Sequence, residues 1–314
     1  MINFLVLGVS MLVLMLSSDK SVTYVMKLSK VFGLSDMTAG FIILSLSTSL
    51  PELLVSINAA FIGQGSLAIG NVLGSNVANI TVILGLAVIF SRKRKLIFKR
   101  RVFDSLTEFL FVSSLIPLFI LQTGKVSILL GFVLISLFVF FAVKTPTKIS
   151  NVEDITVMYK RDKLVVGVKF VISIIFVIIS SNFVVSSGVG IANNLGIPPS
   201  IIGATFIALG TSLPELSTTV QAFRKKLFDV GLGNVLGSCI TNLTLILGVT
   251  SFLNNVTINI VSFTSLILFA IMASMVTWYF ISTGRKLDKR EALILVSLYL
   301  VFILQQLGFS IFIL

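Results

Sequence analysis

The sequence predicts an all-α integral membrane protein of ten transmembrane helices, built as two inverted-topology repeats of five helices each. Two observations predict this class. Apolar residues make up 56% of the 314 residues and charged residues only 11%, whereas about a quarter of the residues in soluble domains are charged. The chain also repeats itself, because Thr-Ser-Leu-Pro-Glu at 48–52 returns 163 residues later at 211–215. A shared spacing of this length indicates two copies of one unit.

Ten largely apolar stretches are expected to cross a bilayer, which takes roughly 20 residues of α-helix each. They lie at about 2–31, 36–62, 66–90, 104–121, 126–143, from 164 onward, around Pro214, 230–252, 257–282 and 292–312. The second and seventh segments are expected to be broken at Pro51 and Pro214. Proline has no N–H, so the carbonyls of Ser47 and Gly210 lose their helical partners.

The longest polar stretch divides the chain into two halves. A first five-helix repeat is expected over 1–144, a cytoplasmic linker over 145–163, and a second five-helix repeat over 164–314.

Basic residues predict the orientation of the spans. Of the 24 Lys and Arg residues, 21 lie in or beside the loops that follow the odd-numbered segments. By the positive-inside rule these loops are cytoplasmic and both termini are outside the plasma membrane. Five spans per repeat then send the second copy into the membrane from the opposite side, an architecture of secondary transporters with a site near the midplane. The same placement explains the net charge of +12, so no nucleic-acid partner is expected.

Cysteine and histidine usage excludes several kinds of site. Cys239 is the single cysteine and the chain has no histidine, so disulfide frameworks and His- or Cys-based metal sites are not expected. The apolar run at the N-terminus is not preceded by a basic region, so it is interpreted as a first helix and not as a cleaved signal.

Each repeated segment places one glutamate, Glu52 or Glu215, inside a long apolar run. Charged side chains in a membrane are costly and by default mark an ion or substrate pathway. Broken helices are tolerated at membrane depth where their backbone lines a cavity or is otherwise satisfied. Each break therefore offers carbonyls, hydroxyls and one carboxylate, which are the oxygen ligands that Ca²⁺ takes in sets of about six to eight. The two glutamates together match one Ca²⁺ or two Na⁺ in charge.

The third and eighth segments supply a second set of polar side chains. Ser75 and Asn79 are four residues apart and share a helical face, as do Ser238 and Asn242. Glycines one turn apart in the same segments, Gly70 and Gly74 with their counterparts, allow close approach of another backbone. A single membrane proline or small-residue pair usually reflects only a kink or packing. Repetition of all these residues in register favours a functional site.

The two repeated segments resemble the α-repeats of the sodium/calcium exchanger branch of the cation/calcium antiporter superfamily. Both copies read Thr-Ser-Leu-Pro-Glu and then Gly-Asn-Val-Leu-Gly-Ser, which is typical of prokaryotic sodium/calcium exchanger homologues. Proton/calcium exchangers usually carry an Asn-Ala-Pro-Glu-like version. The resemblance is strong over about 40–86 and 203–249. It implies a prokaryotic antiporter that exchanges Ca²⁺ for Na⁺, with no enzymatic activity and no cofactor, functional as a monomer in the lipid bilayer.

The resemblance also implies four cation sites in a diamond between segments 2, 3, 7 and 8. The two glutamates would hold Ca²⁺ at the centre, serine hydroxyls would complete the flanking Na⁺ sites, and segments 1 and 6 would slide across the core. The implied ligands are the carboxylates of Glu52 and Glu215, backbone oxygens at Thr48, Thr211, Ser45 and Ala208, the hydroxyls of Ser49, Ser75, Ser212 and Ser238, and the amides of Asn79 and Asn242.

Three departures from the family pattern affect what is expected. Ser47 stands where glycine is common, while Gly210 keeps the usual residue. Asn242 occupies a position that is Asp in many prokaryotic relatives and in the potassium-dependent branch, so no potassium dependence is expected and the Na⁺ stoichiometry stays open. The linker at 145–163 is also too short for the large cytoplasmic Ca²⁺-binding domains of animal exchangers.

Three alternatives remain open at this point. A proton/calcium antiporter of the same fold is one, because membrane carboxylates also serve proton relays. An intramembrane enzyme with two carboxylates would need a nucleophile or metal that the sequence does not supply. A passive channel would show flux without counter-ion exchange.

Overall fold

The computed structural model describes residues 2–31, 45–91, 95–97, 108, 111, 115–144, 160–253, 256–257, 260–283 and 286–308. The start of the expected second segment, most of the fourth segment, most of the linker and the end of the tenth segment lie outside these residues. Within them the chain is helical, with two short antiparallel ladders.

The helices follow the expected order in both halves. The first half contains α1 (Ile2–Val31), α3 (Ser45–Thr48), α4 (Leu50–Phe61), α5 (Gly65–Ala78), the π-helix η2 (Asn79–Ile83), α6 (Leu84–Phe90), α8 (Ile116–Thr123) and α9 (Ile128–Lys144). The second half contains α10 (Lys160–Leu195), α11 (Pro199–Ile202), the π-helix η3 (Gly203–Ile207), α12 (Ala208–Thr211), α13 (Leu213–Arg224), α14 (Phe228–Thr241), the π-helix η4 (Asn242–Ile246), α15 (Leu247–Leu253), α16 (Ile260–Ser282) and α17 (Lys289–Gln306).

Two helix ends differ from the expected bounds. α10 begins at Lys160, so the last residues assigned to the linker are helical, and α17 ends at Gln306, short of the expected 312. The start of α17 is fixed by a capping box, in which Asp288 accepts from the Glu291 N–H and Glu291 accepts from the Asp288 N–H. Such a box satisfies backbone donors that the first helical turn leaves without partners.

Both proline-containing helices break where the sequence predicts. The break falls at Ser49, with φ −83° and ψ 8°, and at Ser212, with φ −86° and ψ 7°. Pro51 and Pro214 then lie in the first turn of α4 and α13, where a missing N–H does no harm. In the second half the two pieces, 199–211 and 213–224, are bent by 41° relative to each other.

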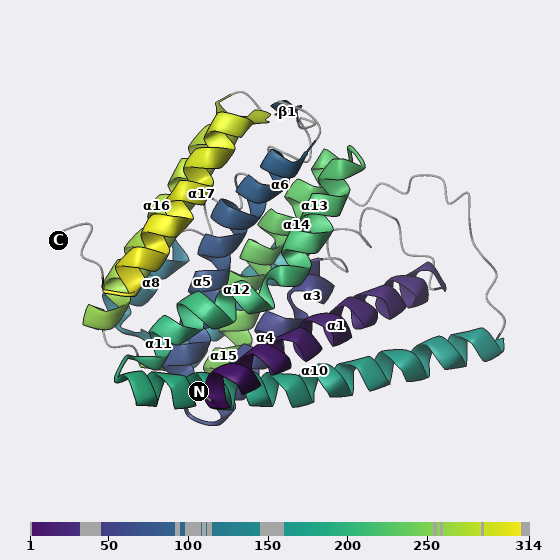
Figure 1. Ribbon diagram of the computed structural model, residues 1–314, viewed down its shortest axis with the longest axis horizontal. Coiled ribbons are helices and arrows are strands. Elements are labelled where there is room, and N and C mark those ends of the chain that lie inside the picture. The colour runs from purple at the N-terminus through teal and green to yellow at the C-terminus, as the bar shows by residue number, and fades with distance from the viewer. Residues whose placement is uncertain are drawn as a thin grey trace.

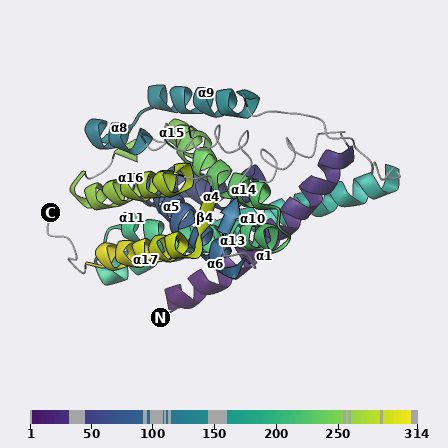
Figure 2. The ribbon, with the colours of Figure 1, turned by 90° about the horizontal axis from the view of Figure 1, so that it is seen from above.

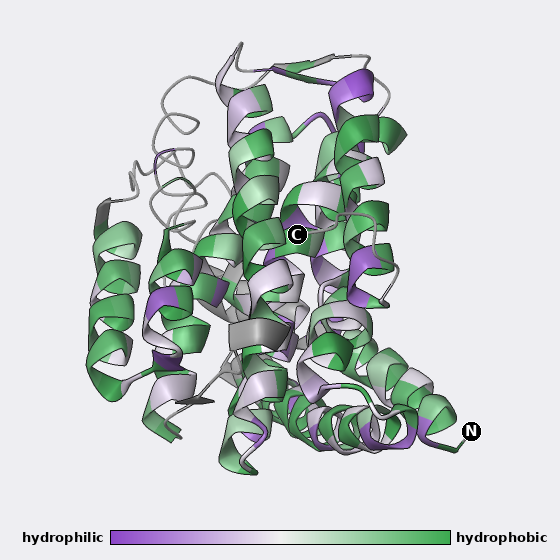
Figure 3. Cartoon of the chain, turned by 90° about the vertical axis from the view of Figure 1, so that its left-hand side faces the viewer, coloured by the Kyte–Doolittle hydropathy of each residue, from purple (hydrophilic) through white to green (hydrophobic). Residues whose placement is uncertain are grey.

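Four helical spans among the described residues are long and apolar enough to cross a membrane, and the bent pair makes a fifth. They are Gly65–Phe90, Leu164–Leu195, Phe228–Leu253 and Phe263–Ser282. Their most apolar windows differ in burial, at 83% for Gly65–Phe90 and Phe228–Leu253 but only 28% for Leu164–Leu195. The first two therefore form the interior, whereas α10 presents an apolar surface suited to lipid. Figure 3 shows hydrophobic residues covering most of the helices.

The long helices α1 and α10 lie side by side and cross the more upright helices of the bundle (Figures 1 and 2). Behind them, α5 to α6 and α14 to α15 form the centre of the molecule. The outer helices pack on the central helices of the other half, with α17 on α6 and α9 on α15. These two contacts are equivalent under the repeat, so the halves embrace each other reciprocally.

The two ladders follow the same reciprocal rule. Strand β1 (Lys95–Ile97) pairs with β4 (Lys286–Asp288), and β2 (Lys125–Val126) pairs with β3 (Val256–Thr257). Each ladder thus joins one loop from each half. Because α16 runs from β3 to β4, the two ladders lie at opposite ends of that helix.

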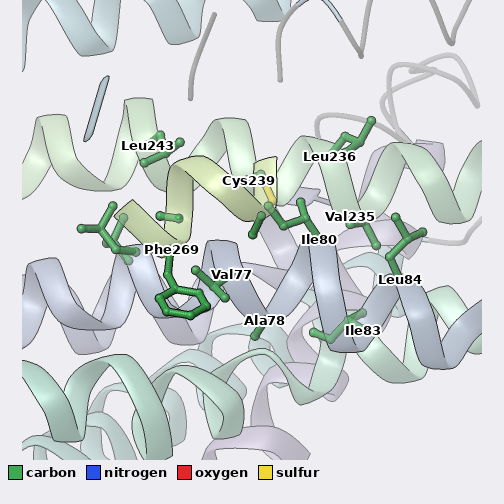
Figure 4. Close-up of a cluster of buried hydrophobic side chains, with 14 of the residues drawn as sticks. Val77, Ala78, Ile80, Ile83, Leu84, Val235, Leu236, Cys239, Leu243 and Phe269 are labelled. Carbon is green, nitrogen blue, oxygen red and sulfur yellow. The ribbon is translucent and has the colours of Figure 1, made fainter. Parts of the chain in front are cut away.

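The central apolar core lies between the two interior spans. Figure 4 shows Val77, Ala78, Ile80, Ile83 and Leu84 facing Val235, Leu236, Cys239 and Leu243, with Phe269 of α16 beside them. The glycines of α5 explain how closely another backbone approaches it. A Cβ atom at Gly74 would collide with the backbone of Ala204, and one at Gly70 with the backbone of Ser200. The close approach predicted from the small residues is therefore present between α5 and the π-helix η3.

Candidate functional site

The two breaks, at Ser49 and Ser212, lie against α14 and α5 respectively, so each broken helix meets the central helix of the other half. Ten of the predicted site residues have side chains that are at most 1% exposed. They are Thr48, Ser49, Glu52, Ser75, Asn79, Thr211, Ser212, Glu215, Ser238 and Asn242. Ala208 is also buried, and its carbonyl accepts from Ser75 Oγ (3.4 Å) and Thr211 Oγ1 (3.2 Å). Ser45 begins α3, and its side chain lies outside what is described.

Each buried glutamate is held by a serine from the other half. Ser212 Oγ donates to Glu52 Oε1 at 2.8 Å, and Ser49 Oγ donates to Glu215 Oε1 at 3.2 Å. Ser238 Oγ makes a further bond to Glu215 Oε1 at 3.3 Å. The second oxygens, Glu52 Oε2 and Glu215 Oε2, have no hydrogen-bond partner among the described residues. Burying such an atom without a partner is costly, so these oxygens are suited to a bound cation.

Asn71 and Asn234 form a polar frame behind the glutamates. Asn71 Nδ2 donates to Ser56 Oγ (3.0 Å) and to the Glu52 carbonyl (3.4 Å), and Asn71 Oδ1 accepts from Thr211 Oγ1 (3.3 Å). Asn234 repeats this pattern with distances of 3.0, 3.4 and 3.2 Å.

The partners of Asn234 are the counterparts of the first set: Thr219 Oγ1, the Glu215 carbonyl and Thr48 Oγ1. Sequence reasoning did not assign a role to either asparagine. The signal was present, because Asn71 recurs as Asn234 inside the repeated Gly-Asn-Val-Leu-Gly-Ser and is a polar residue within an apolar span.

Asn79 and Asn242 each begin a π-helical segment, η2 or η4. A π-bulge is rare and often found at functional sites, because it changes the direction of side chains within a helix. Thr277 Oγ1 of α16 supports η2 by donating to the Ile80 carbonyl at 3.1 Å. Among the described residues, both amide atoms of Asn79 and the Oδ1 of Asn242 have no hydrogen-bond partner.

The chemistry of this set favours a hard cation. The carboxyl groups of Glu52 and Glu215 are close enough to interact electrostatically. The described residues contain no group of three His, Cys, Asp or Glu side chains that would hold a metal. A cation bound here would therefore take hydroxyl, amide and carbonyl oxygens besides the two carboxylates, which is the ligand type of Ca²⁺.

Comparisons with known proteins agree with this chemistry. The family model described as sodium/calcium exchanger protein matches residues 2–145 and 165–308. The chain is 31% identical to sodium/calcium exchanger MaX1 of Methanosarcina acetivorans, over 96% of this chain and 97% of that protein. It is 28% identical to inner membrane protein YrbG of Escherichia coli, over 78% of each.

A solved structure of the sodium-calcium exchanger NCX_Mj, soaked with 2.5 mM Na⁺ and 0.1 mM Ca²⁺, superposes with a TM-score of 0.67 at 25% identity. The match covers 96% of this chain and 97% of that one. The chain therefore belongs to the sodium/calcium exchanger protein family, as a relative of its prokaryotic members.

Proposed function

We propose that the protein is a secondary active antiporter that exchanges Ca²⁺ for Na⁺ across the plasma membrane of a prokaryote. The observation that carries this proposal is the pair of buried glutamates, Glu52 and Glu215, each held at Oε1 by a serine of the other half while Oε2 has no partner among the described residues. Two such oxygens supply the charge that a dehydrated divalent ion needs. Family membership supports Na⁺ as the counter-ion.

The proposed ligands form a central Ca²⁺ site and flanking Na⁺ sites. The carboxylates of Glu52 and Glu215 bind the central ion, with backbone oxygens at Thr48 and Thr211 and the amides of Asn79 and Asn242 beside it. The flanking ions take the hydroxyls of Ser49, Ser75, Ser212 and Ser238 and the carbonyls of Ser45 and Ala208. Burial of the described side chains in this set supports a site shielded from bulk water.

We further propose that the ten spans form two inverted five-helix repeats, over 1–144 and 164–314, joined by a cytoplasmic linker at 145–163. The reciprocal packing of α9 and α17 and the two ladders at opposite ends of α16 support this arrangement. Both termini are then outside the cell and the basic loops inside. The paired α1 and α10 cross the bundle as one unit, and alternating access would come from their movement across the core.

The decisive experiment is ⁴⁵Ca²⁺ uptake into proteoliposomes that contain the purified protein. Uptake is measured with and without an outward Na⁺ gradient, at clamped pH, and again after an ionophore has collapsed any proton gradient. The Glu52→Gln/Glu215→Gln double variant is the control for leak. We expect uptake to follow the Na⁺ gradient and to persist without a proton gradient.

Two results would contradict the proposal. Uptake that disappears with the proton gradient and ignores Na⁺ would identify a proton/calcium antiporter of the same fold. Calcium flux that needs no counter-ion would identify a channel.

A further inference from the structure

We propose that Asn76 is a positioning residue that locks the amide of Asn242 with its oxygen toward the transported cation. In this proposal Cys239, at the equivalent position of the other half, leaves the amide of Asn79 unlocked. The inference rests on the proposed function, which places Asn79 and Asn242 beside the central ion. It assigns a role to two buried residues, Asn76 (4% exposed) and Cys239 (0%), that the ligand set does not include.

The orientation of Asn242 follows from a chain of hydrogen bonds that begins at the backbone. Asn76 Nδ2 donates to the Cys239 carbonyl at 3.2 Å, and because a carbonyl only accepts, this bond fixes which end of the Asn76 amide is the nitrogen. Asn76 Oδ1 then accepts from Asn242 Nδ2 at 3.0 Å. Asn242 Oδ1 is left as the buried atom without a partner among the described residues. The lock therefore leaves the cation-binding end of Asn242 free.

The other half has the same geometry but lacks the lock. Cys239 lies 163 residues after Asn76, and its Sγ points to the Asn76 carbonyl at 4.0 Å, which mirrors the bond from Asn76 to the Cys239 carbonyl. A thiol has no amide oxygen, and its sulfur is only a weak acceptor. Consistently, neither amide atom of Asn79 has a hydrogen-bond partner among the described residues.

This asymmetry has a consequence for ion binding. An amide without a lock can turn its Nδ2 toward the carboxylate oxygens of an empty site, and a cation must then turn the amide back before it binds. The apparent dissociation constant rises in proportion as the competent fraction of the protein falls. A locked amide at Asn242 spares the protein this loss, whereas Asn79 bears it.

Exchanging the two residues between the halves tests the proposal, because each half already accommodates one of them. We would compare wild type, Asn76→Cys, Cys239→Asn and the double exchange. The readouts are equilibrium ⁴⁵Ca²⁺ binding to the purified protein in detergent, the maximal exchange rate in proteoliposomes, and the thermal unfolding midpoint.

We expect Asn76→Cys to raise the half-saturating Ca²⁺ concentration about two- to tenfold, since both amides are then unlocked. Cys239→Asn should lower it about twofold, because the competent fraction for Asn79 rises from roughly one half toward one. The double exchange, which moves the lock to Asn79, should return it close to the wild-type value.

A purely structural role makes different predictions. If Asn76→Cys lowers the unfolding midpoint or the maximal rate while Ca²⁺ affinity stays unchanged, the lock does not exist. Weaker binding by Cys239→Asn, whose affinity should improve, would overturn the proposal even if Asn76→Cys fails to fold. These outcomes concern a wild type that binds Ca²⁺. A wild type that binds none would overturn the proposed function and this inference together.

Discussion

Ser212 Oγ donates a 2.8 Å hydrogen bond to Glu52 Oε1, although the two residues are 160 positions apart in the chain. The equivalent bond, from Ser49 to Glu215, measures 3.2 Å, and Glu215 Oε1 has a second hydroxyl donor in Ser238. The two halves are thus joined at their charged side chains. The join is unequal, because Glu52 depends more on a single serine than Glu215 does.

The first prediction follows from this inequality. Ser212→Ala should raise the half-saturating Ca²⁺ concentration for exchange by about tenfold or more, since a hydrogen bond to a charged group contributes roughly 1.5–3 kcal/mol. Ser49→Ala should have a smaller effect, because Ser238 continues to donate to Glu215. Initial rates of ⁴⁵Ca²⁺ uptake over a range of Ca²⁺ concentrations measure both. A larger loss in Ser49→Ala would show that the printed geometry does not determine which glutamate is the more dependent.

The second prediction concerns the glutamates themselves. Glu52→Gln and Glu215→Gln should each abolish Ca²⁺ exchange while the protein stays folded, because an amide keeps the shape of the carboxylate but not the charge that offsets dehydration of a divalent ion. Uptake assays measure the loss, and size-exclusion profiles with thermal unfolding serve as the folding control. If either variant exchanges Ca²⁺ near the wild-type rate, the central site has been assigned to the wrong residues.

The third prediction concerns the crossing of α5 and η3. Gly74→Ala should destabilise the protein and reduce exchange strongly, because the added Cβ would meet the Ala204 backbone, which cannot move aside as a side chain does. Gly167→Ala in α10 is the matched control, since its Cβ would meet nothing within 4 Å. Thermal unfolding in detergent distinguishes the two. Equal midpoints for both variants would mean that the helices separate easily at this crossing.

Repetition in register decided what the sequence predicts about the site. The breaks at Ser49 and Ser212 and the burial of both glutamates agree with expectations drawn from words that occur twice. Asn71 also occurs twice, and it was missed because its bonds run to backbone and hydroxyl groups that only the folded chain brings near.

Asn76 shows the limit of the same reasoning. Its counterpart is Cys239 and not another asparagine, so no repeated word marks it. Its role depends on a contact between α5 and α14, far apart in the sequence. The three π-helical segments were also not predicted. A π-bulge adds one residue to a helical turn without any proline or glycine signal, and side-chain packing decides where it forms.

The last prediction rests on Asn242. With Asn79 and Asn242 neutral, the site carries two negative charges when both glutamates are ionised, so one Ca²⁺ neutralises it. Three Na⁺ would leave one uncompensated positive charge, which is costly in a poorly solvated site. We therefore expect a third Na⁺ to bind weakly in the wild-type protein. Added K⁺ should not change Ca²⁺ uptake.

Asn242→Asp should strengthen Na⁺ competition against Ca²⁺, but only where the new carboxyl group ionises. The structure explains this condition. Asn242 Nδ2 donates to Asn76 Oδ1 at 3.0 Å, and a protonated carboxyl group can make the same donation, whereas an ionised one would place oxygen against oxygen. The variant should therefore resemble wild type at acidic pH and show stronger Na⁺ competition at alkaline pH. Uptake against graded Na⁺ at fixed voltage, at two pH values and with or without K⁺, tests this. A wild-type requirement for K⁺, or unchanged Na⁺ competition in the variant at alkaline pH, would contradict the charge balance proposed for the site.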